Sequence, residues 1–110
     1  MEFRTGAILL AGLLVAGVAG TARAQSASTL YTRALAQERA VRDAARKPTL
    51  ARIRSAVAAY DRIVRRYPRS GYADNALWQA GHLSLLAYEQ FGQTSDKRNG
   101  LRFLIGRAHV

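Results

Sequence analysis

The feature that most constrains the fold is an apolar pattern that recurs with helical spacing and then ends at a proline. Its members are Ile53, Val57, Tyr60, Val64 and Tyr67. They lie four, three, four and three residues apart, so one face of an α-helix carries all five. Pro68 follows and pushes the residue before it out of the helical region. We therefore predict an amphipathic helix over residues 50–67, with Thr49 as its N-cap.

The rest of the chain also favours helices. Three more are predicted, over residues 28–46, 72–91 and from 95 or 96 to 104. Ser28 or Thr29 is the expected N-cap of the first, and Gly92 suits the left-handed position after the second. Because no stretch alternates strictly between apolar and polar residues, the predicted fold class is all-α.

The first 24 residues have the order of a secretory signal peptide. A short start with one arginine precedes the uncharged, almost wholly apolar residues 6–20. Ala22 and Ala24 then supply the small residues that a signal peptidase needs, which predicts cleavage before Gln25. We expect an exported, periplasmic protein that meets the membrane only through this signal helix. An uncleaved membrane anchor is the alternative.

The last six residues invite an interpretation of their own. Residues 105–110 read IGRAHV, which the codons ATC GGA AGA GCA CAC GTC would encode, and those codons match a widely used short-read sequencing adapter. We expect this tail to be adapter-encoded and the natural protein to continue beyond Leu104. A natural tail is the alternative.

The chain is strongly basic, with 17 Lys and Arg against 7 Asp and Glu and a formal net charge of +10. Such a charge attracts anionic partners, nucleic acid among them. Export separates the chain from nucleic acid, so we expect a protein partner or an anionic cell-wall polymer instead. The candidate partner-binding basic face consists of Arg54, Arg62, Arg65, Arg66 and Arg69. A solvated basic face without a dedicated ligand is the alternative.

The sequence offers little for catalysis. It has no cysteine, which excludes disulfides, thiol nucleophiles and Cys-ligated zinc. With His109 set aside as part of the tail, His82 is the one remaining histidine, and no second histidine stands four residues away. We expect no catalytic residue, metal ligand or cofactor here. Trp78, Tyr72 and Tyr88 could serve as ligand platforms, but their helical spacing favours core packing.

A packing signature of small, aromatic, apolar and proline residues runs through the middle of the chain. Its members are Ala56, Tyr60, Ile63 and Pro68, followed by Ala76 and Gly81. These offsets resemble the tetratricopeptide repeat, a unit of about 34 residues, and the run from Tyr67 to Gly81 resembles the periplasmic class of that repeat. Gly100 and Leu104 repeat the spacing of Ala56 and Tyr60. The resemblance implies a truncated solenoid of antiparallel helical hairpins over residues 25–104.

A closer resemblance concerns the run RRYPRSGYADNALWQAGHLSLLAYEQFG. It is similar to the N-terminal helical region of some bacterial N-acetylmuramoyl-L-alanine amidases, in which an exported repeat domain precedes a zinc-dependent domain that cleaves peptidoglycan. This implies a non-catalytic binding module that docks such an enzyme near the cell wall or a partner. A stand-alone periplasmic scaffold of envelope assembly or cell division is the second hypothesis. Nucleic-acid binding is the third, and it requires that the signal stay uncleaved in the cytoplasm.

Overall fold

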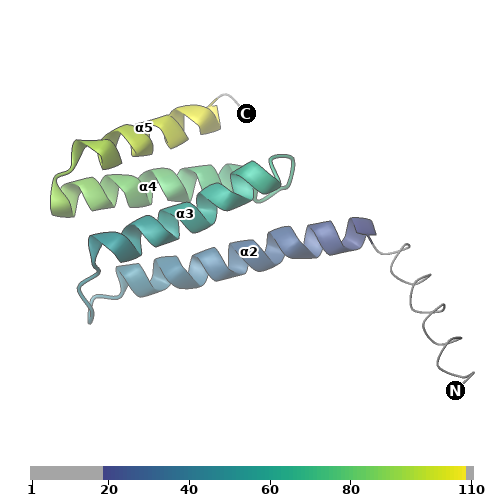
Figure 1. Cartoon of the computed structure of the whole chain (residues 1–110), viewed down its shortest axis with the longest axis horizontal. Helices are drawn as coiled ribbons and strands as arrows, with labels where there is room; N and C mark the ends of the chain where they lie inside the picture. Colours follow the sequence, from purple (N-terminus) through teal and green to yellow (C-terminus); the bar gives the residue numbers. More distant parts are fainter. Residues whose placement is uncertain (1–18, 109–110) are drawn as a thin grey trace, which may run out of the picture.

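A computed structural model describes residues 19–108, and the surroundings of side chains from 26 to 107. Within these residues it contains four helices and no strand: α2 (Ala19–Arg42), α3 (Leu50–Arg66), α4 (Ala73–Phe91) and α5 (Thr94–Ala108). The predicted all-α fold class is confirmed. Consecutive helices lie side by side and run in opposite directions (Figure 1).

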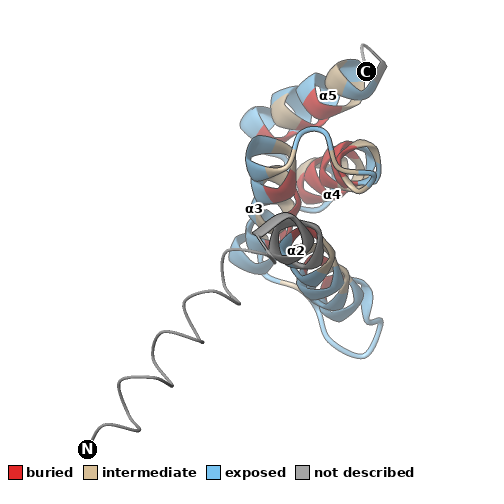
Figure 2. Cartoon of the chain, turned by 90° about the vertical axis from the view of Figure 1, so that its right-hand side faces the viewer, coloured by how far each residue is buried: buried red, intermediate tan, exposed pale blue. Residues whose placement is uncertain are grey.

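Each helix packs against the one that follows it in the chain. In addition, α2 contacts α4, and α3 contacts α5. The contacts are extensive between α2 and α3, between α3 and α4, and between α4 and α5. Tyr31 of α2 hydrogen-bonds Gln79 of α4, and Arg54 of α3 pairs with Asp96 of α5. The buried sides of the helices therefore face one another, and their exposed sides face outward (Figure 2).

One apolar core runs through the layers between the helices. Its largest fully buried side chains are Tyr60, Ile53, Ile63 and Leu83. Burial of a side chain of this size contributes about 1.5–3 kcal/mol. Since three of the four come from α3, this helix is the centre of the core, as its spacing predicts.

The ends of α3 agree with the prediction from sequence. The Thr49 hydroxyl accepts a hydrogen bond from the Arg52 backbone N–H at 3.2 Å, which makes it the N-cap. At the other end Tyr67 is the C-cap, and its N–H donates to the Ile63 carbonyl at 2.8 Å. Pro68 follows directly, so the helix ends where the chain can no longer continue it.

The bounds predicted for the first helix are wrong at both ends. α2 begins at Ala19, so Ser28 and Thr29 lie inside the helix and neither is its N-cap. It ends at Arg42, before the predicted residue 46. The Asp43 carboxylate accepts from the Ala45 N–H at 3.0 Å, and this local bond competes with helical pairing.

The two C-terminal helices differ less from the prediction. α4 ends at Phe91, and Gly92 follows as its C-cap with a φ of 75°, the left-handed conformation that glycine adopts without strain. α5 begins at Thr94 and continues through Ala108, past the predicted end at Leu104. Residues 105–108 of the expected tail thus form the last turn of α5, and Leu101 and Ile105 of this helix are exposed.

The packing signature lies at close contacts between helices. Ala56, Tyr60, Ile63 and Ala76 are fully buried, whereas Pro68 is exposed in the turn after α3. Gly81 lets α5 approach α4, because a Cβ there would lie 2.7 Å from Leu104 Cγ. Gly100 faces it, and a Cβ on Gly100 would lie 3.0 Å from the Gly81 carbonyl oxygen.

Candidate functional site

A groove of about 450 Å³ runs between α3 and α5, with α4 beneath it. Three arginines and two aspartates line it together with polar and apolar side chains. The lining residues are Arg54, Val57, Ala58, Asp61, Arg65, Ser84, Gln93, Ser95, Asp96, Asn99, Arg102 and Phe103. Its volume lies in the range of ligand-binding pockets, and it places groups from α3, α4 and α5 in one concave site.

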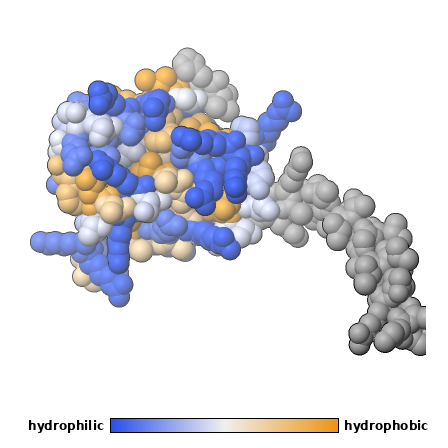
Figure 3. Space-filling model, viewed as in Figure 1, coloured by the Kyte–Doolittle hydropathy of each residue, from blue (hydrophilic) through white to orange (hydrophobic). Residues whose placement is uncertain are grey.

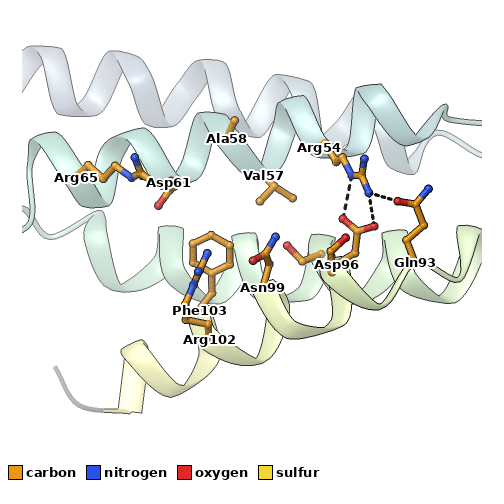
Figure 4. A pocket seen from close by; sticks show the side chains of 12 residues that line it. Arg54, Val57, Ala58, Asp61, Arg65, Gln93, Asp96, Asn99, Arg102 and Phe103 are labelled. Atoms are coloured by element: carbon orange, nitrogen blue, oxygen red, sulfur yellow. Dashed lines mark hydrogen bonds and ion pairs between the residues drawn. The ribbon is translucent and has the colours of Figure 1, made fainter.

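One end of the groove is closed by a charged clamp. The Arg54 guanidinium donates from Nε and from one Nη to the two carboxylate oxygens of Asp96, at 3.0 and 2.9 Å. It also donates to the side-chain oxygen of Gln93 at 2.8 Å. The hydrogen bond to Asp96 raises the pKa of Arg54 above its ordinary value. Figure 4 shows this clamp bridging α3 and the start of α5.

A second ion pair lies at the other end, within α3. Arg65 Nε lies 2.8 Å from an Asp61 carboxylate oxygen one helical turn away. The Arg65 side chain is largely exposed, so solvent screens this pair and it contributes about 0.3–0.5 kcal/mol. Both carboxylates of the groove are therefore already matched by arginines.

The middle of the groove holds polar groups that no side chain of the described residues satisfies. Ser84 of α4 and the half-exposed Asn99 of α5 line this part of the groove, and neither side chain makes a hydrogen bond within residues 19–108. Arg102 has no carboxylate partner in that range, and its guanidinium lies 5.7 Å from the centre of the Phe103 ring. Asn99 points from α5 into the space facing Val57 (Figure 4).

The structure divides the predicted basic face. Arg54 and Arg65 line the groove, both engaged in ion pairs, while Arg62, Arg66 and Arg69 are exposed and lie outside the groove lining. Hydrophilic side chains are spread over the face seen in Figure 3, with apolar patches between them. Arg102, Asn99 and Ser84 were not singled out from sequence, because they reach the groove only when α4 and α5 pack against α3.

A second polar cluster joins α2, α3 and α4. One Glu38 oxygen accepts from the Tyr60 hydroxyl at 2.6 Å and from the Gln79 amide at 3.1 Å, and the other accepts from Arg42 at 2.8 Å. The Tyr31 hydroxyl donates to Gln79 at 2.7 Å, and its ring packs edge-on against Tyr60. We call these five residues the Glu38 junction.

Burial governs the ionisation of both tyrosines in the Glu38 junction. Burial raises the pKa of Tyr60 far above its ordinary value of 10.0, and the hydrogen bond and negative charge of Glu38 raise it further. Burial also raises the pKa of Tyr31. The two phenols therefore stay neutral in this cluster. Their role here is structural, as hydrogen-bond donors to Glu38 and Gln79.

Tyr72, the N-cap of α4, and the aromatic residues Trp78 and Tyr88 within α4 have different surroundings. Tyr72 is half-buried, with its ring centre 5.0 Å from that of Tyr31. Tyr88 is half-buried beneath Lys97. The expectation that Trp78 packs in the core is wrong, because it is 43% exposed and its ring lies tilted against that of His82, with ring centres 4.2 Å apart.

Other parts of the sequence-based prediction meet the structure only in part. Residues 1–18 of the predicted signal peptide lie outside the described residues, and Ala22 and Ala24 fall in the first turns of α2. Among the described helices none is both long and apolar enough to cross a membrane. The described residues also contain no group of three or more His, Cys, Asp or Glu placed to hold a metal ion.

Comparison with known proteins identifies no relative of the chain. No family model, curated protein or solved structure matches it.

Proposed function

We propose that the chain is an exported, non-catalytic binding module whose helices stack as tetratricopeptide-like hairpins, and that the groove between α3 and α5 docks an anionic partner. The observation that carries this proposal is a set of polar side chains in the groove that have no hydrogen-bond partner among the described residues. Arg102, Asn99 and Ser84 have hydrogen-bonding capacity that nothing else in residues 19–108 uses. A ligand would satisfy them.

The repeat interpretation is supported by the equivalent spacing of small and bulky residues on α3 and α5. Ala56 and Tyr60 are fully buried on α3, and Gly100 and Leu104 meet Gly81 at the contact between α4 and α5. α3 starts at Leu50 and α5 at Thr94, a longer period than the roughly 34 residues of a tetratricopeptide repeat. The long α4 accounts for part of this difference.

An anionic partner is favoured by the charge of the groove and its surroundings. The two carboxylates are neutralised by Arg54 and Arg65, so Arg102 leaves the lining with a net positive charge. The exposed Arg62, Arg66 and Arg69 of the candidate face add to the positive field that draws anions to the chain.

We further propose that the partner lies in the envelope and that the chain is the N-terminal part of a peptidoglycan amidase. This rests on the signal-like order of residues 1–24 and on the resemblance of the run from Arg65 to Gly92. The genomic sequence beyond Leu104 tests the link. Histidine and glutamate zinc ligands downstream would support it, and further repeats without them would identify a stand-alone scaffold instead.

Export is tested by expressing the full chain in a bacterial host and sequencing the N-terminus of the periplasmic product. A mature protein beginning at Gln25 is the expected result. Retention of the intact chain in the cytoplasm would overturn export and revive nucleic-acid binding.

Docking is tested by co-sedimenting the full chain with purified peptidoglycan and by titrating it with poly-L-glutamate. Binding should weaken with added salt, since a screened attraction drives it. The double variant Arg65→Glu, Arg102→Glu should bind at least tenfold more weakly. The matched control is Arg33→Glu, Arg39→Glu, which makes the same charge change on exposed positions of α2. Equal losses in both variants would show that only net charge matters and would overturn the groove as the docking site.

A further inference from the structure

The groove contains side chains that have no hydrogen-bond partner among the described residues and that could bond a peptide backbone. A side-chain amide offers both a donor and an acceptor, which is the pair that a peptide unit presents. Asn99 holds such an amide in the middle of the groove with no protein partner among the described residues. Ser84 of α4, a residue that is 2% exposed, also lines the groove. A ligand that fills the groove recovers the hydrogen bonds that these groups lack.

The length of the groove suits a short extended segment. Arg54 and Arg65 mark its two ends on the same face of α3, about three turns or roughly 16 Å apart. An extended chain rises about 3.3 Å per residue, so about five residues fit between the two arginines. In such a segment alternate side chains point to opposite sides.

The groove lining has an apolar part and a basic part, which would contact alternate side chains of the bound segment. Val57 and Ala58 offer apolar surface, whereas Arg102 offers a guanidinium without a carboxylate partner among the described residues. Alternating acidic and apolar side chains match this division. A glycan would need an open aromatic face for stacking, and Phe103 is only 9% exposed.

We infer that the groove binds an extended acidic segment of a partner protein, with Asn99 bonding the backbone and Arg102 pairing with an acidic side chain. This rests on the proposed function, which makes the groove a docking site, and it names the class of ligand. In this mode the groove recognises the peptide through hydrogen bonds to its backbone and through contacts with every second side chain, as other proteins do with extended peptides.

The test uses the full chain and the hexapeptide (Glu-Val)₃-NH₂ with fluorescein on its N-terminal amine. Fluorescence anisotropy should show saturable binding, and the same peptide with methylated backbone nitrogens on the valines should bind at least tenfold more weakly. N-methylation removes backbone donors without changing charge, so it tests whether the groove recognises the peptide backbone. The peptide Ac-(Lys-Val)₃-NH₂ should not bind.

Two pairs of variants locate the contacts. Asn99→Ala should weaken the hexapeptide about tenfold without changing the salt dependence, whereas Asn75→Ala, the same change on the exposed side of α4, should leave binding unchanged. Arg102→Gln should weaken binding and reduce the salt dependence, whereas Arg98→Gln on the same helix should have a much smaller effect. Thermal unfolding followed by circular dichroism checks that each variant keeps its fold.

The outcomes separate this inference from the proposed function. If the chain binds poly-L-glutamate through the groove but N-methylation and Asn99→Ala have no effect, backbone recognition is wrong and anionic docking stands. If purified peptidoglycan binds through the groove and the peptides do not, the ligand is a cell-wall polymer and the inference is overturned. If no anionic probe binds, both fail.

Discussion

The Glu38 junction and the α3–α5 groove are both polar sites between helices, yet they differ in how far their groups are satisfied. In the junction, each oxygen of Glu38 accepts from a neighbouring side chain, and Gln79 both donates and accepts. In the groove, Ser84 and Asn99 have no hydrogen-bond partner among residues 19–108.

The polar side chains of the Glu38 junction bond one another and hold the helices together. Those in the middle of the groove are available to a ligand. A satisfied buried network contributes to stability and fixes the register of α2, α3 and α4. Asn99 is half-exposed and makes no hydrogen bond to the described residues, so removing its amide should cost the fold little and should cost binding more. The predictions below use stability and binding to separate the two sites.

The largest effect is expected at the centre of the junction. Tyr60→Ala removes a fully buried ring and leaves the Glu38 carboxylate without its shortest hydrogen bond. The free energy of unfolding should fall by about 3–5 kcal/mol. Urea denaturation followed by circular dichroism measures it. A loss below about 1 kcal/mol would contradict the position of Tyr60 in the core.

A smaller loss is expected where α4 meets α5. In Gly81→Val the new side chain meets Leu104 Cγ at 2.7 Å and the Gly100 carbonyl oxygen at 3.2 Å. Overpacking of this kind costs about 2 kcal/mol, and because α5 forms one wall of the groove, poly-L-glutamate binding should weaken as well. Gly71→Val is the matched control, since a Cβ there meets nothing within 4 Å. Equal stability of the two variants would argue against the close contact.

Tyr60→Phe sharpens the comparison by removing only the hydroxyl. Loss of the hydrogen bond to Glu38 should cost about 1.5 kcal/mol at neutral pH, since Arg42 and Gln79 still satisfy the carboxylate.

The stability difference between the wild type and Tyr60→Phe should depend on pH. Because folding raises the pKa of Tyr60, its contribution to stability is fully present below about pH 10 and is lost as pH rises toward the folded pKa. The stability difference between the wild type and Tyr60→Phe should therefore narrow above pH 10. Urea denaturation at pH 7 and at several values above pH 10 measures it. A constant difference would show that the phenol titrates normally.

The smallest effect on stability is expected in the groove. Asn99→Ala removes an amide that makes no hydrogen bond to the described residues, so the free energy of unfolding should change by less than about 0.5 kcal/mol. Urea denaturation again measures it. A loss above about 2 kcal/mol would mean that Asn99 holds the fold and would remove the contrast between the two sites.

The parts of the fold that sequence predicts well depend on neighbouring residues. The bounds of α3 follow from a cap at Thr49 and a stop at Pro68, and both signals coincide with the apolar spacing. Gly92 ends α4 for a similarly local reason. The predicted bounds of α2 are wrong because the prediction assigns residues 1–24 to the signal peptide and because Asp43 ends the helix through its own side chain.

The candidate site could not be read from sequence in the same way. Arg54 was predicted as part of a free basic face, but it pairs with Asp96, which is far away along the chain. Asn99 and Ser84 carry no recognisable local pattern. They become a site only because α4 and α5 pack against α3, which periodicity on a single helix does not specify.

The most direct test of the docking site uses the two asparagines of the chain, Asn75 and Asn99. Nitrogen-15 NMR of the full chain, titrated with Ac-(Glu-Val)₃-NH₂, reports both side-chain amides at once. The Asn99 amide signals should shift and saturate while those of Asn75 stay in place. Shifts of the Trp78 indole with an unchanged Asn99 would place the ligand on the exposed face of α4 and contradict docking in the groove.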